Sequence, residues 1–119
     1  MYLSIVIPAY NEENRIGTSL TKIHSFLKKQ NYDFEIIIID DGSKDKTLNL
    51  LSKYSQNIHN LIVLRNGRNQ GKGFSVKKGV LKSKGDIILF TDADLSTPIG
   101  ELDKLISWLG SGYQISIGS

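Results

Sequence analysis

Two carboxylates one residue apart, Asp92 and Asp94, are the residues in this sequence best suited to chemistry. They follow the apolar run 87–90, and a bend there would let both converge on one hard cation. Mg²⁺ and Mn²⁺ prefer such oxygen ligands, and they bridge protein carboxylates to phosphate groups. The alternative is an ordinary turn with a helix-capping aspartate. The position directly after an apolar run favours the metal site.

A second polar cluster, Asp40-Asp41-Gly42-Ser43, follows the apolar run 34–39. An aspartate at the end of a strand can accept hydrogen bonds from the N–H of a base or from ribose hydroxyls. Asp-Gly-Ser is equally well suited to a turn that leads into a helix cap. Both interpretations stay open from this segment alone.

Residues 69–73, Asn-Gln-Gly-Lys-Gly, form a glycine-rich basic loop. Such a loop lets the backbone approach a diphosphate, with Lys72 or Arg68 supplying positive charge. It is not a P-loop, because Asn66 stands five residues before Gly71 where that motif requires glycine. It is also not the dinucleotide-binding fingerprint, which follows the first strand. A flexible loop without a ligand is the alternative.

Other chemistries find little support in the residue types present. The chain has no cysteine, which excludes disulfides, thiolate metal sites and a cysteine nucleophile. The two histidines, His24 and His59, have no partner at ligand spacing, so neither is expected to act in catalysis or metal binding. Trp108 lies among leucines and is expected in the core or an interface.

Strand and helix patterns alternate along the chain and must position these clusters. Short apolar runs predict buried strands at 3–8, 34–39, 61–64 and 86–91, and an alternating segment predicts a last strand at 113–117. Helical spacing predicts a helix after each of the first four strands. The first has Ile16, Leu20, Ile23 and Leu27 on its buried side, and the second has Leu48 and Leu51 and is capped by Ser43 or Asp45. The third covers about 74–82, and the fourth begins at Pro98.

This alternation predicts an α/β fold with an open, mostly parallel sheet and helices on both faces. A length of 119 residues suits one domain. Ligands of such sheets bind beyond the carboxyl ends of the strands. The clusters described above, and the segment 8–12, all follow predicted strands, so we expect them to meet at one rim of the sheet.

The composition narrows the class of partner. Hydrophobic residues make up 39% and charged residues 23%, as in globular proteins. The net charge of +3 comes from lysines spread along the chain, so nucleic acid is not an expected partner. No stretch approaches the ~20 apolar residues that span a bilayer, and the start lacks the basic region of a signal peptide. We therefore expect a cytoplasmic chain.

The four clusters at 8–12, 40–43, 69–73 and 92–94, in this order, resemble the motifs of inverting GT-A glycosyltransferases of family 2. The longer segment 90–98, Phe-Thr-Asp-Ala-Asp-Leu-Ser-Thr-Pro, is most similar to dolichyl-phosphate β-glucosyltransferases and their bacterial polyprenyl-phosphate relatives. Dolichyl-phosphate mannose synthases are next in similarity. The resemblance implies a GT-A, Rossmann-like nucleotide-binding half.

The resemblance also implies a role for each matching residue. Pro8, Tyr10 and Glu12 would line the nucleoside pocket, with Glu12 near the ribose. Asp41, rather than Asp40, would face the base. Lys72 would lie near the diphosphate.

For the metal, the resemblance implies that Asp92 and Asp94 hold Mg²⁺ or Mn²⁺ and that Asp92 also contacts the nucleotide. Mannose synthases have glutamine at the place of Ser96, so serine there bears on the sugar donor. A bridging cation stabilises the charge that develops on a leaving nucleoside diphosphate. No catalytic residue is identifiable, and a prenyl-phosphate acceptor, itself an oxyanion, needs little help from a general base.

The implied reaction is transfer of glucose from UDP-glucose to a polyprenyl or dolichyl phosphate. The alternatives are GDP-mannose-dependent transfer to dolichyl phosphate and a GT-A enzyme with a saccharide acceptor. Residues 1–119 would form the nucleotide-sugar-binding part, truncated before the acceptor-binding half, and would transfer sugar poorly alone. Membrane association would come only through missing carboxyl-terminal parts, with the full-length protein at the cytoplasmic face. Exposed edges of the sheet would favour self-association.

Two classes of protein outside this family remain as alternatives. A haloacid-dehalogenase-like phosphatase also uses Asp-x-Asp, but that motif normally follows the first strand, whereas here it follows the fourth predicted strand. A nucleotide-binding module without turnover would keep the same clusters and perform no transfer.

Overall fold

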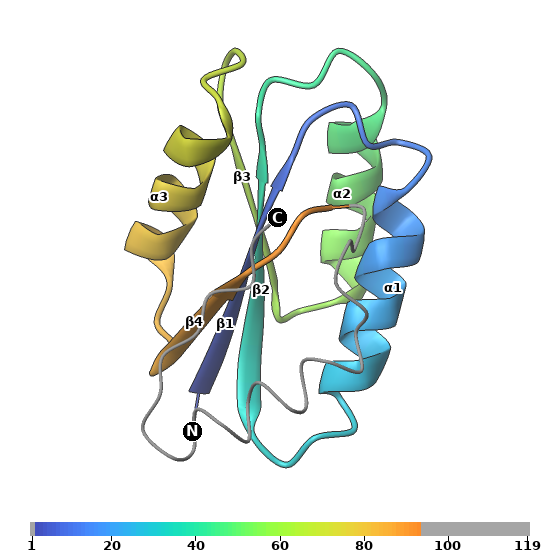
Figure 1. Ribbon diagram of the computed structural model, residues 1–119. Coiled ribbons are helices and arrows are strands. Elements are labelled where there is room, and N and C mark those ends of the chain that lie inside the picture. The colour runs from blue at the N-terminus through green and yellow to red at the C-terminus, as the bar shows by residue number, and fades with distance from the viewer. Residues whose placement is uncertain (1, 94–119) are drawn as a thin grey trace.

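A computed structural model describes residues 2–93 of the chain. Strands and helices alternate throughout this part (Figure 1). The elements are β1 (Tyr2–Ala9), α1 (Ile16–Leu27), β2 (Asp33–Asp40), α2 (Thr47–Asn57), β3 (Leu61–Arg65), α3 (Lys72–Lys82) and β4 (Ile87–Phe90). The first four predicted strands and first three predicted helices are confirmed. The helix predicted from Pro98, the strand predicted at 113–117 and Trp108 lie outside the described residues.

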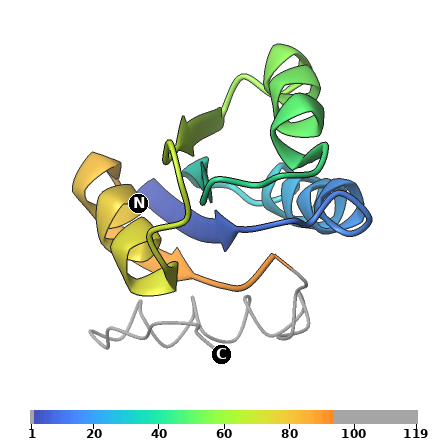
Figure 2. The same ribbon diagram turned by 90° about the horizontal axis from the view of Figure 1, so that it is seen from above.

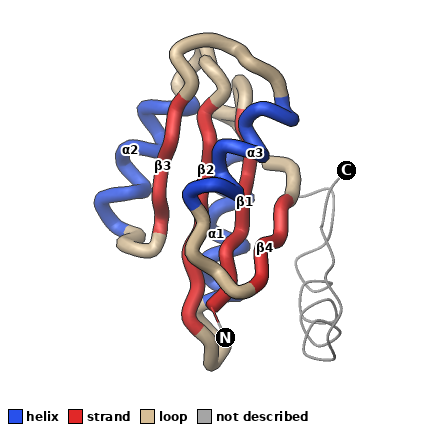
Figure 3. Tube along the Cα trace, turned by 90° about the vertical axis from the view of Figure 1, so that its left-hand side faces the viewer, coloured by secondary structure: helices blue, strands red, loops and turns tan. Residues whose placement is uncertain are grey.

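The strands form a parallel sheet in the order β3-β2-β1-β4 (Figure 3). Ile5 of β1 is in register with Ile36 of β2 on one side and with Leu89 of β4 on the other. From β1 the chain proceeds outward to β2 and β3, and it then crosses back to place β4 on the far side of β1. The strand order therefore reverses between β1 and β4, the position where open α/β sheets bind ligands.

Helices cover both faces of the sheet, with α1 and α2 on one face and α3 on the other (Figures 1 and 2). This arrangement follows from the handedness of parallel connections. A right-handed crossover places its helix on one face when the chain moves outward and on the opposite face when it moves back. The predicted fold class, an open parallel sheet with helices on both faces, is confirmed.

The helices are held by one large and one small apolar cluster. The predicted stripe of α1 faces the large cluster, and its four members are at most 1% exposed: Ile16, Leu20, Ile23 and Leu27. In the small cluster Val6 and Ile39 face α3. A Cβ on Gly79 would lie 2.5 Å from Val6 Cγ1, so glycine is what allows α3 to pack this close to the sheet. None of the helices between residues 2 and 93 has the length and apolar character needed to cross a bilayer.

A buried polar network fixes β4 against β1 at the amino ends of the strands. Ser4 Oγ donates a hydrogen bond to Glu35 Oε2 over 2.6 Å, and the backbone N–H of Lys84 donates to the same oxygen over 2.6 Å. The backbone N–H of Gly85 donates to Ser4 Oγ over 2.9 Å. These contacts fix the position at which β4 begins. They therefore also fix the position of Asp92, which follows the carboxyl end of β4.

Candidate functional site

A cleft of about 400 Å³ lies at the carboxyl ends of β1, β2 and β4. It includes the point between β1 and β4 at which the strand order reverses. Six of the seven residues that the sequence predicted for the site line this cleft, and the seventh, Asp94, lies outside the described residues. The predicted residues in its lining are Pro8, Tyr10, Glu12, Asp41, Lys72 and Asp92, and they are joined by Ala9, Asn69, Gly71 and Ala93.

The loop after β1 is fastened to the loop after β2. The backbone N–H of Asn11 donates to Ser43 Oγ over 2.9 Å, and Asn11 Oδ1 accepts a hydrogen bond from the backbone N–H of Lys44 over 2.9 Å. Asn11 has a φ of 52°, in the left-handed region that asparagine tolerates better than most residues. These contacts hold Tyr10, which is 38% exposed, at the edge of the cleft.

Glu12 is held at its backbone and at its carboxylate. Its backbone N–H donates to Thr47 Oγ1 over 2.8 Å, and its carbonyl accepts from the N–H of Ile16, where α1 begins. Its Oε2 is buried and lies 2.7 Å from Nε of Arg15. The two groups form an ion pair. Although they are close, Oε2 accepts no hydrogen bond, so the angles at this contact are not those of a hydrogen bond. Arg15, which the sequence did not single out, thus holds the Glu12 carboxylate in the lining of the cleft.

Asp45 precedes the N-cap residue Lys46 and accepts hydrogen bonds from Thr47, the first residue of α2, so of the two predicted caps Asp45 is the one in contact with the start of the helix. Its Oδ1 accepts hydrogen bonds from the N–H of Thr47 over 2.9 Å and from Thr47 Oγ1 over 2.5 Å. Its Oδ2 accepts from the N–H of Glu13 over 3.2 Å. Desolvation raises the pKa of Asp45, but the hydrogen bonds from Thr47 and Glu13 together outweigh it, and the pKa lies below its usual value.

Asp41 is the organising residue of the cleft on the β2 side. Its Oδ1 accepts hydrogen bonds from Asn66 Nδ2 over 2.8 Å and from the N–H of Gln70 over 2.7 Å. Its Oδ2 accepts from the N–H of Gly71 over 3.0 Å. The side chain of Asp41 thus holds the glycine-rich loop. Its neighbour Asp40 does not line the cleft, and its Oδ2 accepts the N–H of Ser43 over 3.3 Å.

Asn66 connects Asp41 to α3 and is only 6% exposed. Its Nδ2 donates to Asp41 Oδ1 and also to Ser75 Oγ over 3.0 Å. Its Oδ1 accepts from Lys78 Nζ over 3.0 Å, which fixes the orientation of the amide. In the sequence, Asn66 stands out only as a departure from the P-loop. A polar residue directly after a strand and before a glycine-rich loop was the available signal.

Two glycines shape the same loop. Gly42 has a φ of 72°, and a Cβ there would lie 2.5 Å from the carbonyl carbon of Arg68 and 2.6 Å from the backbone nitrogen of Asn69. The turn after β2 and the glycine-rich loop therefore touch through their backbones. Gly71 has a φ of 101°, a conformation that glycine adopts without strain, and it directly precedes α3.

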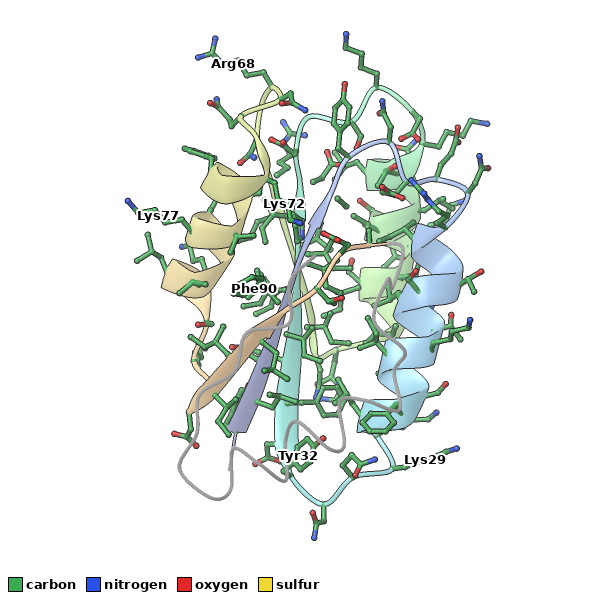
Figure 4. All side chains as sticks on the ribbon, in the orientation of Figure 1. Lys29, Tyr32, Arg68, Lys72, Lys77 and Phe90 are labelled. Atoms are coloured by element: carbon green, nitrogen blue, oxygen red, sulfur yellow. The ribbon has the colours of Figure 1, made fainter. Side chains whose placement is uncertain are left out.

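Lys72 is the first residue of α3, two residues earlier than the predicted start, and it reaches into the cleft. Its Nζ lies 2.6 Å from Oδ1 of Asp92, across the point where the strand order reverses. Arg68, the other predicted source of charge, is exposed and points away from the cleft, as does Lys77 (Figure 4). Of these two residues, Lys72 lines the cleft and Arg68 does not.

Asp92 is delivered to the cleft by a segment that is pinned at both ends. The N–H of Thr91 donates to the carbonyl of Val6, and Ser19 Oγ of α1 donates to the carbonyl of Ala93. Among residues 2–93, no three His, Cys, Asp or Glu side chains are grouped closely enough to hold a metal ion. Asp92 does present a carboxylate that already contacts a cationic group, the ammonium of Lys72. Mg²⁺ and Mn²⁺ take carboxylate oxygens as ligands, so Asp92 is a residue of the kind that binds these ions.

The chain has an open, parallel α/β sheet with a cleft at its switch point, the place where such sheets bind ligands. Residues 4–119 match the model of glycosyl transferase family 2, and the chain belongs to this family. The predicted resemblance is thereby confirmed.

Curated relatives of the chain are also glycosyltransferases. The chain is 39% identical over 112 residues to a dolichyl-phosphate beta-glucosyltransferase of Dictyostelium discoideum, an alignment that covers 88% of this chain and 34% of the relative. The chain thus spans about a third of the length of this relative.

Two solved structures share the fold. The mannosyltransferase PcManGT of Pyrobaculum calidifontis, in complex with GDP-Man and Mn²⁺, superposes with a TM-score of 0.76 at 24% identity, covering 90% of this chain and 32% of that one. TarS 1–349 of S. aureus, in complex with UDP-GlcNAc, gives a TM-score of 0.71 at 29% identity, covering 93% of this chain and 32% of that one.

Proposed function

We propose that this chain is the donor-binding part of a glycosyltransferase that moves glucose from UDP-glucose to a polyprenyl or dolichyl phosphate with the help of Mg²⁺ or Mn²⁺. The observation that carries the proposal is the convergence of six predicted residues, from four separate segments, on one cleft at the switch point. The name of the Dictyostelium relative supports the choice of sugar and acceptor.

The cleft offers separate groups for the parts of a nucleoside diphosphate. Pro8, Tyr10 and Glu12 form the side that would take the nucleoside. Glu12 Oε2 pairs with Arg15, so Oε1 would accept from ribose hydroxyls. Asp41 would accept a hydrogen bond from the base. A carboxylate has about four lone-pair positions, and the three hydrogen bonds that Asp41 already accepts leave one available.

The diphosphate would lie against the segment that leads into α3. Gly71 leaves the backbone bare, and a Cβ there would meet nothing within 4 Å. Lys72 supplies a positive charge at the amino end of a helix, where anions bind favourably. The backbone amides of Gln70 and Gly71 are held by Asp41, so the loop is ordered for its ligand.

Asp92 and Asp94 would hold the metal ion. A bound divalent cation supplies charge stabilisation for a departing nucleoside diphosphate. The remaining work of the described residues is to orient the donor, because a phosphate acceptor carries its own negative charge and needs little deprotonation.

The base and the metal requirement are tested by the melting temperature of the chain with UDP, GDP and dTDP, each with and without Mn²⁺. A ligand at about 100 times its dissociation constant adds about 2.7 kcal/mol to the free energy of unfolding. We expect a rise in melting temperature with UDP that requires Mn²⁺. A rise with GDP alone would transfer the assignment to mannose donors. No rise with any nucleotide would contradict the proposed donor site.

A further inference from the structure

Lys72 and Asp92 face each other across the cleft, and each belongs to a different part of the proposed donor site. Lys72 Nζ lies 2.6 Å from Asp92 Oδ1, and the side chains are 47% and 22% exposed. In the proposed function the lysine serves the diphosphate and the aspartate serves the metal. The structure shows these two groups in contact with one another.

A metal ion on the same carboxylate oxygen would compete with this contact. Mg²⁺ binds carboxylate oxygens at about 2.0–2.1 Å, inside the distance at which the ammonium now lies. Two cations that share one oxygen repel strongly, since Coulomb energies at such separations are large even near a protein surface. Coordination of Asp92 through Oδ1 therefore favours movement of Lys72 away from it.

The backbone around Lys72 is fixed, so that the movement falls to the side chain. The N–H of Gly71 donates to Asp41 Oδ2 over 3.0 Å, and its carbonyl accepts from the N–H of Ser75 over 3.1 Å. The lysine side chain is half-exposed and long, and it lies at the edge of a cleft of about 400 Å³. Rotation about its own bonds is enough to take the ammonium from Asp92 to an anion in the cleft.

We infer that Lys72 is an exchangeable counter-ion: it neutralises Asp92 until a divalent cation takes the carboxylate, and it then neutralises the donor's diphosphate. This inference rests on the proposed function. It has one distinctive consequence, which is that Lys72 opposes the binding of the metal alone and favours the binding of the nucleotide with metal. A lysine that served only the fold would not act with opposite signs on the two ligands.

The first arm of the test measures Mn²⁺ binding without nucleotide, from the electron paramagnetic resonance signal of free Mn²⁺ in solutions of the purified chain. We expect Lys72→Met to bind Mn²⁺ about 2- to 5-fold more tightly than the wild type, the range expected for losing a half-exposed ion pair. Lys72→Arg keeps the charge and should stay close to the wild type. Lys77→Met removes a lysine of the same helix that points away from the cleft and is the matched control (Figure 4).

The second arm measures UDP binding at saturating Mn²⁺ by isothermal titration calorimetry. Here Lys72→Met should weaken UDP binding about 10-fold, because a charge-assisted contact to the diphosphate is lost. Lys77→Met should leave it unchanged. Circular dichroism of each variant checks that the fold is retained, and Lys72→Gln, a second uncharged replacement, keeps the test decisive if the methionine variant fails to fold.

The two proposals fail in different ways. Equal or weaker binding of Mn²⁺ to Lys72→Met, with normal binding of UDP and Mn²⁺ to the wild type, would overturn the exchange and leave the donor site standing. A wild-type chain that does not bind UDP with Mn²⁺ would overturn the proposed function, and the exchange with it.

Discussion

Asn66 Nδ2 donates a hydrogen bond to Asp41 Oδ1 over 2.8 Å, and this contact joins the carboxylate proposed to face the base to the helix that carries the proposed diphosphate lysine. The opposite side of the Asn66 amide accepts from Lys78 Nζ of α3. The proposed base side and the proposed diphosphate side of the cleft are therefore joined by one hydrogen-bonded unit.

Asn66→Asp should loosen this unit without changing its shape. The substitution replaces a donor by a carboxylate oxygen that faces Asp41 Oδ1, and like charges at this distance repel. We expect faster hydrogen exchange at the amides of Gln70 and Gly71, and UDP binding weaker by about 10-fold, a loss typical of one broken buried hydrogen bond to a charged group. Asn57→Asp, at the exposed end of α2, is the matched control. Unchanged exchange in Asn66→Asp would contradict this account of the loop.

Gly42→Ala should disturb the cleft through the backbone. The new Cβ would lie 2.5 Å from the Arg68 carbonyl carbon, and a φ of 72° is strained for alanine. We expect a loss of about 2 kcal/mol in the free energy of unfolding by urea, within the range for such backbone strain. The control is Gly73→Ala, since a Cβ there meets nothing within 4 Å and the residue lies in α3. That variant should be slightly more stable than the wild type.

Asp45→Ala should destabilise the chain at neutral pH by about 1 kcal/mol, the usual cost of losing a helix cap. The folded-state pKa of Asp45 is lowered, so its contribution is present above its unfolded pKa of about 4 and is lost as pH falls through the folded value. The gap in urea midpoint between wild type and variant should therefore shrink between pH 7 and pH 3. A gap of constant size would show that the carboxylate charge is not what stabilises the cap.

His24 should make stability fall at mildly acidic pH. Burial, together with Lys28 and His59, lowers the pKa of His24 below its usual value of about 6.5. The unfolded chain then binds more protons below that pH, so the stability that is fully present above about pH 6.5 declines as pH falls through the folded-state pKa. We expect His24→Gln to flatten the urea midpoint between pH 7.5 and pH 5.5. An equally steep decline in the variant would assign the pH dependence to other groups.

Much of the fold was readable because the buried residues are periodic. The stripe Ile16, Leu20, Ile23 and Leu27 located α1 and its buried side, since each member must face the sheet to be buried. The sheet's rim followed from strand ends, because parallel strands bring their carboxyl ends to one edge. The start of α3 was set two residues late, because Lys72 and Gly73 carry no apolar signal and the helix begins there through the loop's contacts with Asp41.

Most connections within the site were beyond the reach of the sequence pattern. Arg15 and Glu12 stand three residues apart, a charge spacing that the sequence does show, but Lys78 and Asn66 are far apart in the chain and nothing in their spacing pairs them. The ion pair between Lys72 and Asp92 joins residues twenty positions apart, and only the return of the chain to the far side of β1 brings them together. Pairing of this kind depends on topology rather than on local pattern.

The central claim, that this cleft binds a nucleotide with a divalent cation at Asp92, is tested most directly by calorimetric titration of UDP in the presence of Mn²⁺ into two aspartate variants. Asp92→Asn alters the carboxylate that follows β4, and Asp86→Asn alters an exposed carboxylate just before the same strand. The account predicts that Asp92→Asn loses UDP binding at least 10-fold while Asp86→Asn binds as the wild type does, in line with about 1.5–3 kcal/mol for a contact to a charged group. Equal binding by both variants would contradict it.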